Sequence, residues 1–296
     1  MKTNSYASDL ILLLAAVIWG FAFVAQRVGM EHVGPFTYTG VRFALGTVAL
    51  LPFLWVRLSK KKEIVQAENR AQRGKLILGM IMTGLFLFGG VTFQQLGLQT
   101  TSAGKAGFIT GLYVVFIPFA GLLFGQRSGL VIWIGAALSI IGLYFLSMTG
   151  EFRLSPGDQL VFWCAVMFTF HVLFIAWLSP LMDSFLLAVI QFAITAALSL
   201  LIAFAIEPVE LSSIADAWIP IAYGGLLSVG VAYTLQVVAQ QTAHPAYASI
   251  ILSLEAVYAV LGGWRILDET FTPRMFLGCA LMMAGMVLVQ IKHRNG

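Results

Sequence analysis

The chain has 296 residues, of which 59% are hydrophobic and only 10% are charged, and its mean hydropathy is +0.91. A soluble domain carries about 25% charged residues, because these side chains cover its wet surface. The composition therefore excludes an ordinary soluble enzyme and a disordered protein, and it predicts a membrane protein. The net charge of +4 does not indicate a nucleic-acid partner, because most basic residues gather in one loop and at the C-terminus.

Ten continuous apolar runs follow one another along the chain, each about as long as the 20 residues that span a bilayer as a helix. The runs do not alternate between apolar and polar residues, as the strands of a membrane barrel would. We therefore expect an all-α polytopic membrane protein with ten transmembrane helices, over residues 8–28, 35–57, 76–98, 102–124, 129–149, 158–179, 184–206, 217–239, 245–267 and 273–291.

The distribution of Lys and Arg predicts the orientation. The loop 57–75 holds seven of the 17 basic residues, and such loops stay in the cytoplasm. Ten helices then place both termini in the cytoplasm and the loop 207–216 outside. This arrangement leaves 11 basic residues inside and five outside, with Arg42 within the second helix. The basic loop could also bind anionic lipid, but a topology signal explains it without a ligand.

An internal repeat relates the two halves of the chain. Residues 94–121 align with 236–263 without gaps at an offset of 142, and residues 41–44 (VRFA) align with 190–193 (IQFA) at an offset of 149. Each copy therefore holds five helices. Because five is odd, the second copy enters the membrane from the opposite side. We expect two inverted-topology five-helix repeats, typical of alternating-access transporters with a site near the midplane, over residues 1–150 and 151–296.

Several motifs occur in order along nearly the whole chain: AAVIWGFAFV (15–24), VRFALG (41–46), LGLQTTSAGKAGFI (96–109), FIPFAGLLFGQR (116–127) and SLEAVYAVLGGWRILDET (253–270). Together they resemble the EamA-type family of the drug/metabolite transporter superfamily. The chain departs from the family at Gln126, where Glu is common. The resemblance implies a ten-helix basket in the bacterial inner (plasma) membrane. Its first, third, fourth, sixth, eighth and ninth helices would surround a central cavity.

Glu255 is the main candidate for a functional group, because a carboxyl group inside a bilayer usually faces a cavity or a partner. It lies midway along the ninth run and shares one helical face with Tyr247 and Tyr258. At the repeat offset, Lys105 and Tyr113 occupy the matching face of the fourth run. Glu255 is expected to bind a cationic group or a proton. The alternative is a carboxyl group that only fixes helix packing.

Other polar and aromatic residues within the runs have two interpretations each. Arg42 can bind a substrate carboxylate or extend toward lipid headgroups. His171 can titrate near neutral pH or only hydrogen-bond within the packing. Trp19 of the first run and Phe168 of the sixth can form aromatic walls of a pocket or only pack between helices. The amides Gln94 and Gln236 can line the pocket or link helices by hydrogen bonds. The predicted substrate-binding set is Trp19, Arg42, Gln94, Tyr113, Phe168, His171, Gln236, Glu255 and Tyr258.

Motifs for nucleotide binding, hydrolysis and metal binding are missing from the sequence. The residues therefore predict a secondary transporter without cofactor or metal, an exporter of small metabolites such as amino acids or amphipathic compounds. A membrane-embedded enzyme and a passive channel are the alternatives. The expected partners are a small-molecule substrate, membrane lipid and either protons, coupled through Glu255, or an exchanged solute. The sequence is compatible with a monomer and does not specify the oligomeric state.

Overall fold

The computed structural model describes residues 5–60, 70–123, 125, 128–147 and 155–295. Every regular element in these ranges is helical, as the apolar runs predict. The elements are α1 (Ser5–Gly29), α2 (Pro35–Lys60), α3 (Arg70–Gly97), α4 (Ala103–Gly111), α5 (Tyr113–Leu123), α6 (Leu130–Ser147), α7 (Pro156–Leu178), α8 (Ser184–Ile206), α9 (Leu211–Asp216), α10 (Trp218–Ala222), η1 (Tyr223–Tyr233), α11 (Thr234–Ala239), α12 (Pro245–Leu252), α13 (Glu255–Ile266) and α14 (Pro273–Asn295).

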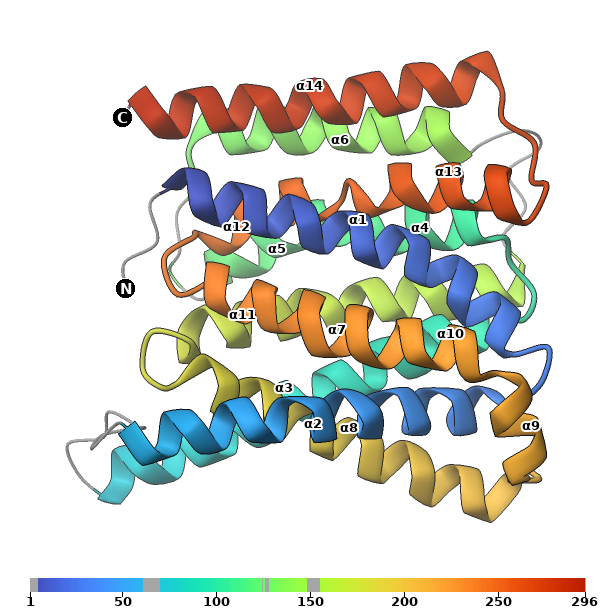
Figure 1. Cartoon of the computed structure of the whole chain (residues 1–296). Coiled ribbons are helices and arrows are strands. Elements are labelled where there is room, and N and C mark those ends of the chain that lie inside the picture. The colour runs from blue at the N-terminus through green and yellow to red at the C-terminus, as the bar shows by residue number, and fades with distance from the viewer. Residues whose placement is uncertain (1–4, 61–69, 124, 126–127, 148–154, 296) are drawn as a thin grey trace.

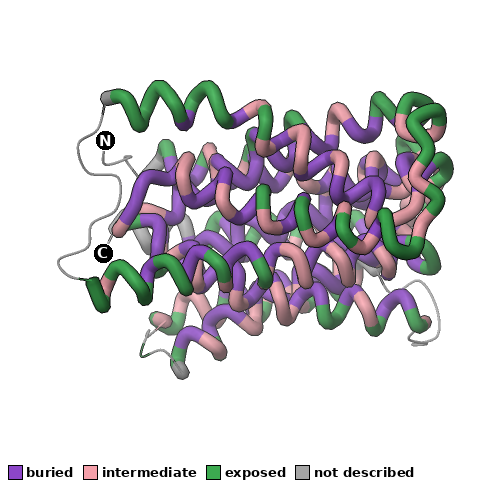
Figure 2. The backbone as a smooth tube through the Cα atoms, turned by 90° about the horizontal axis from the view of Figure 1, so that it is seen from below, coloured by how far each residue is buried: buried purple, intermediate pink, exposed green. Residues whose placement is uncertain are grey.

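The long helices lie side by side in one bundle (Figure 1). Helix α1 begins and α14 ends at the same end of this bundle, which we call the terminal end. The opposite end, which carries α9, we call the distal end. Helices α6 and α14 pack together along one side, and α2 and α8 along the other. Buried residues concentrate between these two pairs, while exposed residues follow the outer helices (Figure 2).

The outer surface of the bundle is apolar, as lipid contact requires. Large side chains such as Trp55, Phe204 and Phe276 are each about 70% exposed. Eight segments in the described ranges are long and apolar enough to cross a membrane, and two shorter apolar helices lie at residues 130–145 and 273–289. The eight segments and the two shorter helices overlap the ten predicted runs, and the prediction of ten membrane-spanning helices is met for eight of them. The chain is therefore a multi-pass membrane protein.

Helices α6 and α14 approach each other closely because glycines face each other where they cross. A Cβ atom built on Gly142 would lie 2.6 Å from the carbonyl oxygen of Gly278. Small residues allow the two backbones to come this near. The close van der Waals packing stabilises the helix pair, because the hydrophobic effect does not drive helices together in lipid.

Two of the predicted helices are interrupted near their middle. The run 102–124 is divided into α4 and α5 at Leu112, and the run 245–267 into α12 and α13 at Leu254. At each break the amide of the leucine bonds to the carbonyl three residues earlier, at 3.2 Å in both cases. These tighter turns replace the regular α-helical pattern locally. The two leucines are aligned residues of the sequence repeat.

The eighth predicted run is also irregular. Residues Tyr223–Tyr233 form a π-helix between α10 and α11. Such wide turns are rare and usually occur at functional sites. Hydropathy does not distinguish a π-helix from an α-helix, since both bury and expose residues at a similar period.

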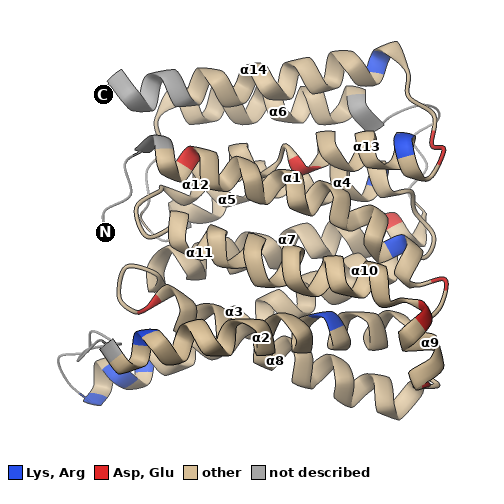
Figure 3. Ribbon diagram, viewed as in Figure 1, with Lys and Arg blue, Asp and Glu red and all other residues tan. Residues whose placement is uncertain are grey.

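The predicted loop 57–75 is shorter than expected, because α2 continues to Lys60 and α3 begins at Arg70. Polar helical turns persist beyond the apolar run because the headgroup region solvates them. Basic side chains gather at these helix ends (Figure 3). The predicted loop 207–216 contains α9, and its Glu207 carboxylate accepts hydrogen bonds from the Phe36 and Thr37 amides of α2, at 2.9 and 2.7 Å. Glu207 thus caps that helix N-terminus.

Candidate functional site

A cavity of about 460 Å³, open space at its mouth included, lies in the interior of the bundle. It is bounded by helices from both halves of the chain. Its lining combines one guanidinium group, one carboxyl group, aromatic rings and amides. The lining residues are Trp19, Ala22, Phe23, Gln26, Arg42, Gln94, Tyr113, Phe168, His171, Val172, Ser228, Tyr233, Gln236, Leu252 and Glu255.

Eight of the nine predicted site residues line this cavity, and Tyr258 does not. Tyr258 instead packs against α1, where a Cβ atom built on Gly20 would lie 2.2 Å from the Cβ of Tyr258. Tyr258 therefore does not line this cavity, and its part in substrate binding stays a prediction. The face of α13 that Glu255 and Tyr258 share is thus divided between the cavity, which Glu255 lines, and α1, against which Tyr258 packs.

Glu255 is the first residue of α13, directly after the break, and it is 5% exposed. Tyr113 is the first residue of α5, directly after the other break. The Tyr113 hydroxyl faces the Glu255 carboxyl group. Within the described residues no ion pair joins Glu255 to a basic side chain. The carboxyl group therefore lies in the cavity without a fixed positive partner in that part of the chain.

Arg42 lies in the same cavity and is 1% exposed. Its Nη2 donates to Gln26 Oε1 at 3.3 Å, and its guanidinium carbon lies 5.4 and 5.2 Å from the ring centres of Tyr38 and Phe43. Among the described residues, Nε has no hydrogen-bond partner and no carboxylate pairs with the guanidinium. Aromatic faces and one amide hold this cation, which leaves donors available for an anionic ligand.

Tyr233 lies at the centre of the aromatic lining. Its ring centre is 4.6 Å from that of Trp19 and 6.0 Å from that of His171. The Trp19 Nε1 donates to the Ser228 carbonyl of the π-helix at 3.3 Å. Arg42 and Glu255 line the same cavity as this aromatic group.

The predicted His and Gln residues make contacts between helices. His171 Nε2 lies 2.7 Å from Gln191 Oε1, so a hydrogen bond links the imidazole to α8. Gln94 Nε2 donates to Thr110 Oγ1 at 3.3 Å. In the described ranges, Gln236 Oε1 has no hydrogen-bond partner. It is therefore an acceptor available at the cavity wall.

Three polar lining residues were not predicted: Gln26, Ser228 and Tyr233. Gln26 follows Trp19 by two helical turns, and this spacing was a usable signal. Tyr233 precedes Gln236 by one turn, which was a second signal. Ser228 lies within the π-helix, and no sequence pattern marks that wider turn.

Across residues 5–60, 70–123, 125, 128–147 and 155–295, no group of three or more His, Cys, Asp or Glu side chains is placed to hold a metal ion.

The EamA-like transporter family matches the chain twice, over residues 7–148 and 155–291. The chain belongs to the EamA-like transporter family. An uncharacterized transporter of Archaeoglobus fulgidus is 30% identical over 291 residues, covering 96% of this chain and 86% of the relative. The uncharacterized transporter YoaV of Bacillus subtilis is 22% identical, with 94% of each chain covered. The uncharacterized inner membrane transporter YedA of Escherichia coli is 24% identical, covering 93% of this chain and 88% of YedA.

Solved structures share the fold of this EamA-like chain. One of them, a crystal structure, superposes with a TM-score of 0.77 at 19% identity, and 99% of each chain is covered. At this identity the likeness concerns the fold alone.

Proposed function

We propose that this EamA-like chain is a secondary transporter that exports small metabolites, such as amino acids or amphipathic compounds, by alternating access. The observation that carries the proposal is the cavity between the two halves of the chain, where Arg42 and Glu255 lie without a described ionic partner. A transporter needs charged groups that are not already paired within the protein. A solute of opposite charge can then bind to them and later dissociate. An enzyme would need clustered catalytic groups instead.

The cavity chemistry suggests the class of solute. The Arg42 guanidinium matches a carboxylate, and the Glu255 carboxylate matches an amine. Trp19 and Tyr233 supply an apolar wall beside them. A solute that carries both charges and an apolar portion satisfies all three features. The charged groups of this solute would replace the hydrogen bonds to water that Arg42 and Glu255 lose on burial.

The architecture that we propose for alternating access is two inverted repeats of five membrane-spanning helices each. The double family match over residues 7–148 and 155–291 supports this division. The packing supports it as well, because α3 packs on α7 while its equivalent η1 packs on α1, and α4 packs on α7 while α12 packs on α1. The breaks at Leu112 and Leu254 lie at aligned positions. A site between such repeats can open to either side of the membrane.

We propose that the terminal end of the bundle faces the cytoplasm of a bacterial cell and that the membrane is the inner one. Basic residues gather at the end of α2 and the start of α3, at the terminal end, whereas most acidic side chains lie at the distal end, which also carries some basic side chains (Figure 3). This asymmetry follows the rule that basic residues stay inside. The name of YedA as an inner membrane transporter is consistent with the same location.

Energy for export would come from protons or from an exchanged solute. Glu255 is the proposed proton carrier, because burial favours the neutral form of a carboxyl group and a nearby cation the charged form. Exposure of Glu255 to one side and then the other would load and release one proton per cycle.

Flux assays with purified protein in proteoliposomes test the proposal. Radiolabelled amino acids and amphipathic amines are offered with and without an imposed pH gradient, and empty vesicles serve as the control. We expect saturable flux that competing solutes inhibit. Unsaturable flux together with single-channel conductance would identify a passive channel, and chemical conversion of the solute an enzyme.

A further inference from the structure

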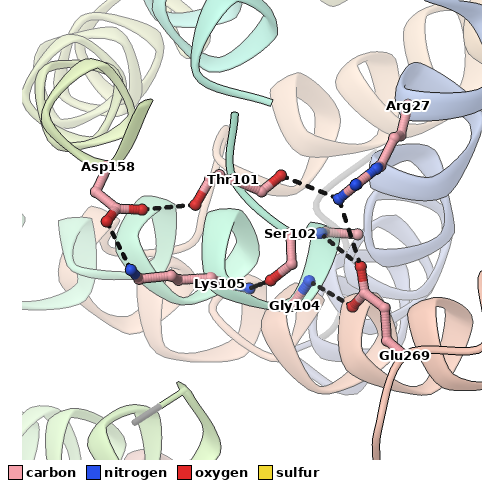
Figure 4. Close-up of polar contacts among 8 residues, drawn as sticks. Arg27, Thr101, Ser102, Gly104, Lys105, Asp158 and Glu269 are labelled. Carbon is pink, nitrogen blue, oxygen red and sulfur yellow. Dashed lines mark hydrogen bonds and ion pairs between the residues drawn. The ribbon is translucent and has the colours of Figure 1, made fainter. Parts of the chain in front are cut away.

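One salt bridge and one hydrogen bond join α4 and the turn before it to α7 at the distal end of the bundle (Figure 4). Lys105 Nζ donates to Asp158 Oδ2 at 2.6 Å, and Thr101 Oγ1 donates to Asp158 Oδ1 at 2.5 Å. The Asp158 side chain is fully buried, while that of Lys105 is 31% exposed. Charged hydrogen bonds of this length are the strong ones. This link therefore ties the first half of the chain to the second on the distal side of the cavity.

A second link joins α1 to α12 at the terminal end. The Tyr247 hydroxyl donates to Asp9 Oδ1 in a short hydrogen bond, and both residues are buried. Next to it, Ser8 Oγ lies 3.4 Å from Thr242 Oγ1. These contacts also tie one half of the chain to the other, on the terminal side of the cavity.

The two links occupy equivalent positions of the sequence repeat. Asp9 precedes Asp158 by 149 residues, which is the offset of the first two helices of each repeat. Lys105 precedes Tyr247 by 142 residues, the offset of the fourth helix. The same contact is thus formed twice, once at each end, with an ammonium group as the donor in one copy and a phenol in the other.

The cavity lies midway between the links. Asp9 precedes the cavity residue Trp19 by ten residues on α1, and Asp158 precedes the cavity residue Phe168 by ten residues on α7. Ten residues of α-helix extend about 15 Å. Each link therefore closes the space between a pair of helices about three turns from the cavity, on opposite sides of it.

We propose that Lys105–Asp158 and Asp9–Tyr247 are the two latches of this transporter, and that one opens while the other stays closed. This inference rests on the proposed alternating-access function. It assigns a role to four residues outside the cavity, and it makes the two sides chemically different. The distal latch is an ion pair, reinforced where the Glu269 carboxylate accepts from the Ala103 and Gly104 amides at the start of α4. The terminal latch is a hydroxyl–carboxylate bond.

The equivalent position of the terminal latch differs in sequence. The residue aligned with Ala103 is Pro245, which has no amide hydrogen to donate. At the distal latch, Arg27 also contributes, with its Nη1 3.1 Å from the Thr101 carbonyl. The two latches are therefore built from different groups.

Thiol accessibility measures each latch without a substrate. Ser228, which lines the cavity, is changed to Cys in a background with Cys164→Ala and Cys279→Ala. An impermeant thiol reagent is then applied to proteoliposomes from one side at a time. We expect Lys105→Met to raise the labelling rate from the distal side about tenfold and to lower it from the terminal side. Tyr247→Phe should do the reverse, by about fivefold.

Further variants keep the test decisive. Because Lys105→Met leaves a buried carboxylate unpaired, the double variant Lys105→Met/Asp158→Asn repeats the measurement without that charge. Lys105→Tyr places a phenol opposite Asp158, as Tyr247 does opposite Asp9. Its labelling rate from the distal side should be close to that of the parent and below that of Lys105→Met. Lys75→Met, an exposed lysine at the start of α3, is the matched control and should leave both rates unchanged.

The latch assignment is overturned if Lys105→Met and Tyr247→Phe shift the labelling to the same side, or if neither shifts it while the parent protein still transports. Opposite shifts without any solute flux would instead support the latches and contradict the proposed substrates. The two proposals therefore fail separately.

Discussion

The Tyr113 hydroxyl and the Glu255 carboxyl group face each other in the cavity, although 142 residues separate them in the chain. Each is the first residue after a helix break, and the two are aligned in the sequence repeat. The repeat thus provides two equivalent positions, and the chain uses one for a neutral hydroxyl and the other for an acid. A phenol ordinarily titrates at about pH 10 and a carboxyl group at about pH 4, so the proton exchange that we propose is assigned to Glu255 and not to Tyr113.

Replacement of Glu255 by Gln keeps the shape of the side chain and removes its titration. If coupling runs through this carboxyl group, pH-driven uptake should fall to the level of empty vesicles, whereas solute exchange at equal pH should persist. Both fluxes are measured in the same proteoliposomes. Glu31→Gln, at an exposed position, is the control and should leave both unchanged. Normal pH-driven uptake by Glu255→Gln would remove the proton role.

Replacement of Arg42 by Gln should weaken transport of solutes that carry a carboxylate. A hydrogen bond to a charged group contributes about 1.5–3 kcal/mol, which corresponds to about a 10- to 100-fold loss of affinity. The methyl ester of the same solute should lose far less. Competition against a labelled solute measures both affinities. Arg274→Gln is the matched control, because that guanidinium stacks over Tyr144 outside the cavity lining. Equal losses for acid and ester would contradict carboxylate recognition by Arg42.

Replacement of Gly20 by Ala should destabilise the protein. The added Cβ would lie 2.2 Å from the Cβ of Tyr258 and 2.8 Å from the Glu255 carbonyl oxygen, so α1 and α13 must separate. Overpacking of this kind costs about 1–3 kcal/mol. The midpoint of thermal unfolding in detergent should fall by several degrees. Gly74→Ala, where no atom lies within 4 Å of the new Cβ, should keep the midpoint or raise it, because alanine favours helix.

The proposed orientation predicts opposite labelling of two exposed serines. Ser59 lies at the end of α2 and Ser212 in α9, at opposite ends of the bundle. In intact cells an impermeant thiol reagent should react with Ser212→Cys and not with Ser59→Cys. The partly exposed Cys279 is first replaced by Ser. Labelling of Ser59→Cys from outside would reverse the orientation.

Much of this protein follows from the sequence alone. The helices lie where the apolar runs predict them, because a bilayer requires about 20 apolar residues and allows no unpaired backbone. Arg42, Glu255 and most of the other candidates line one cavity for a related reason. A polar side chain within an apolar run is costly in lipid, and it therefore turns toward the protein interior.

Only the tertiary structure determined how these residues meet. The pairs Arg42–Gln26 and His171–Gln191 depend on how neighbouring helices pack, which hydropathy does not encode. Tyr258 packs against α1 instead of lining the cavity, because α1 covers that part of α13. Ser228 lines the cavity from within the π-helix. Hydrogen bonds that reach three, four or five residues back arise from nearly the same apolar sequence, and packing against the neighbouring helices selects among them.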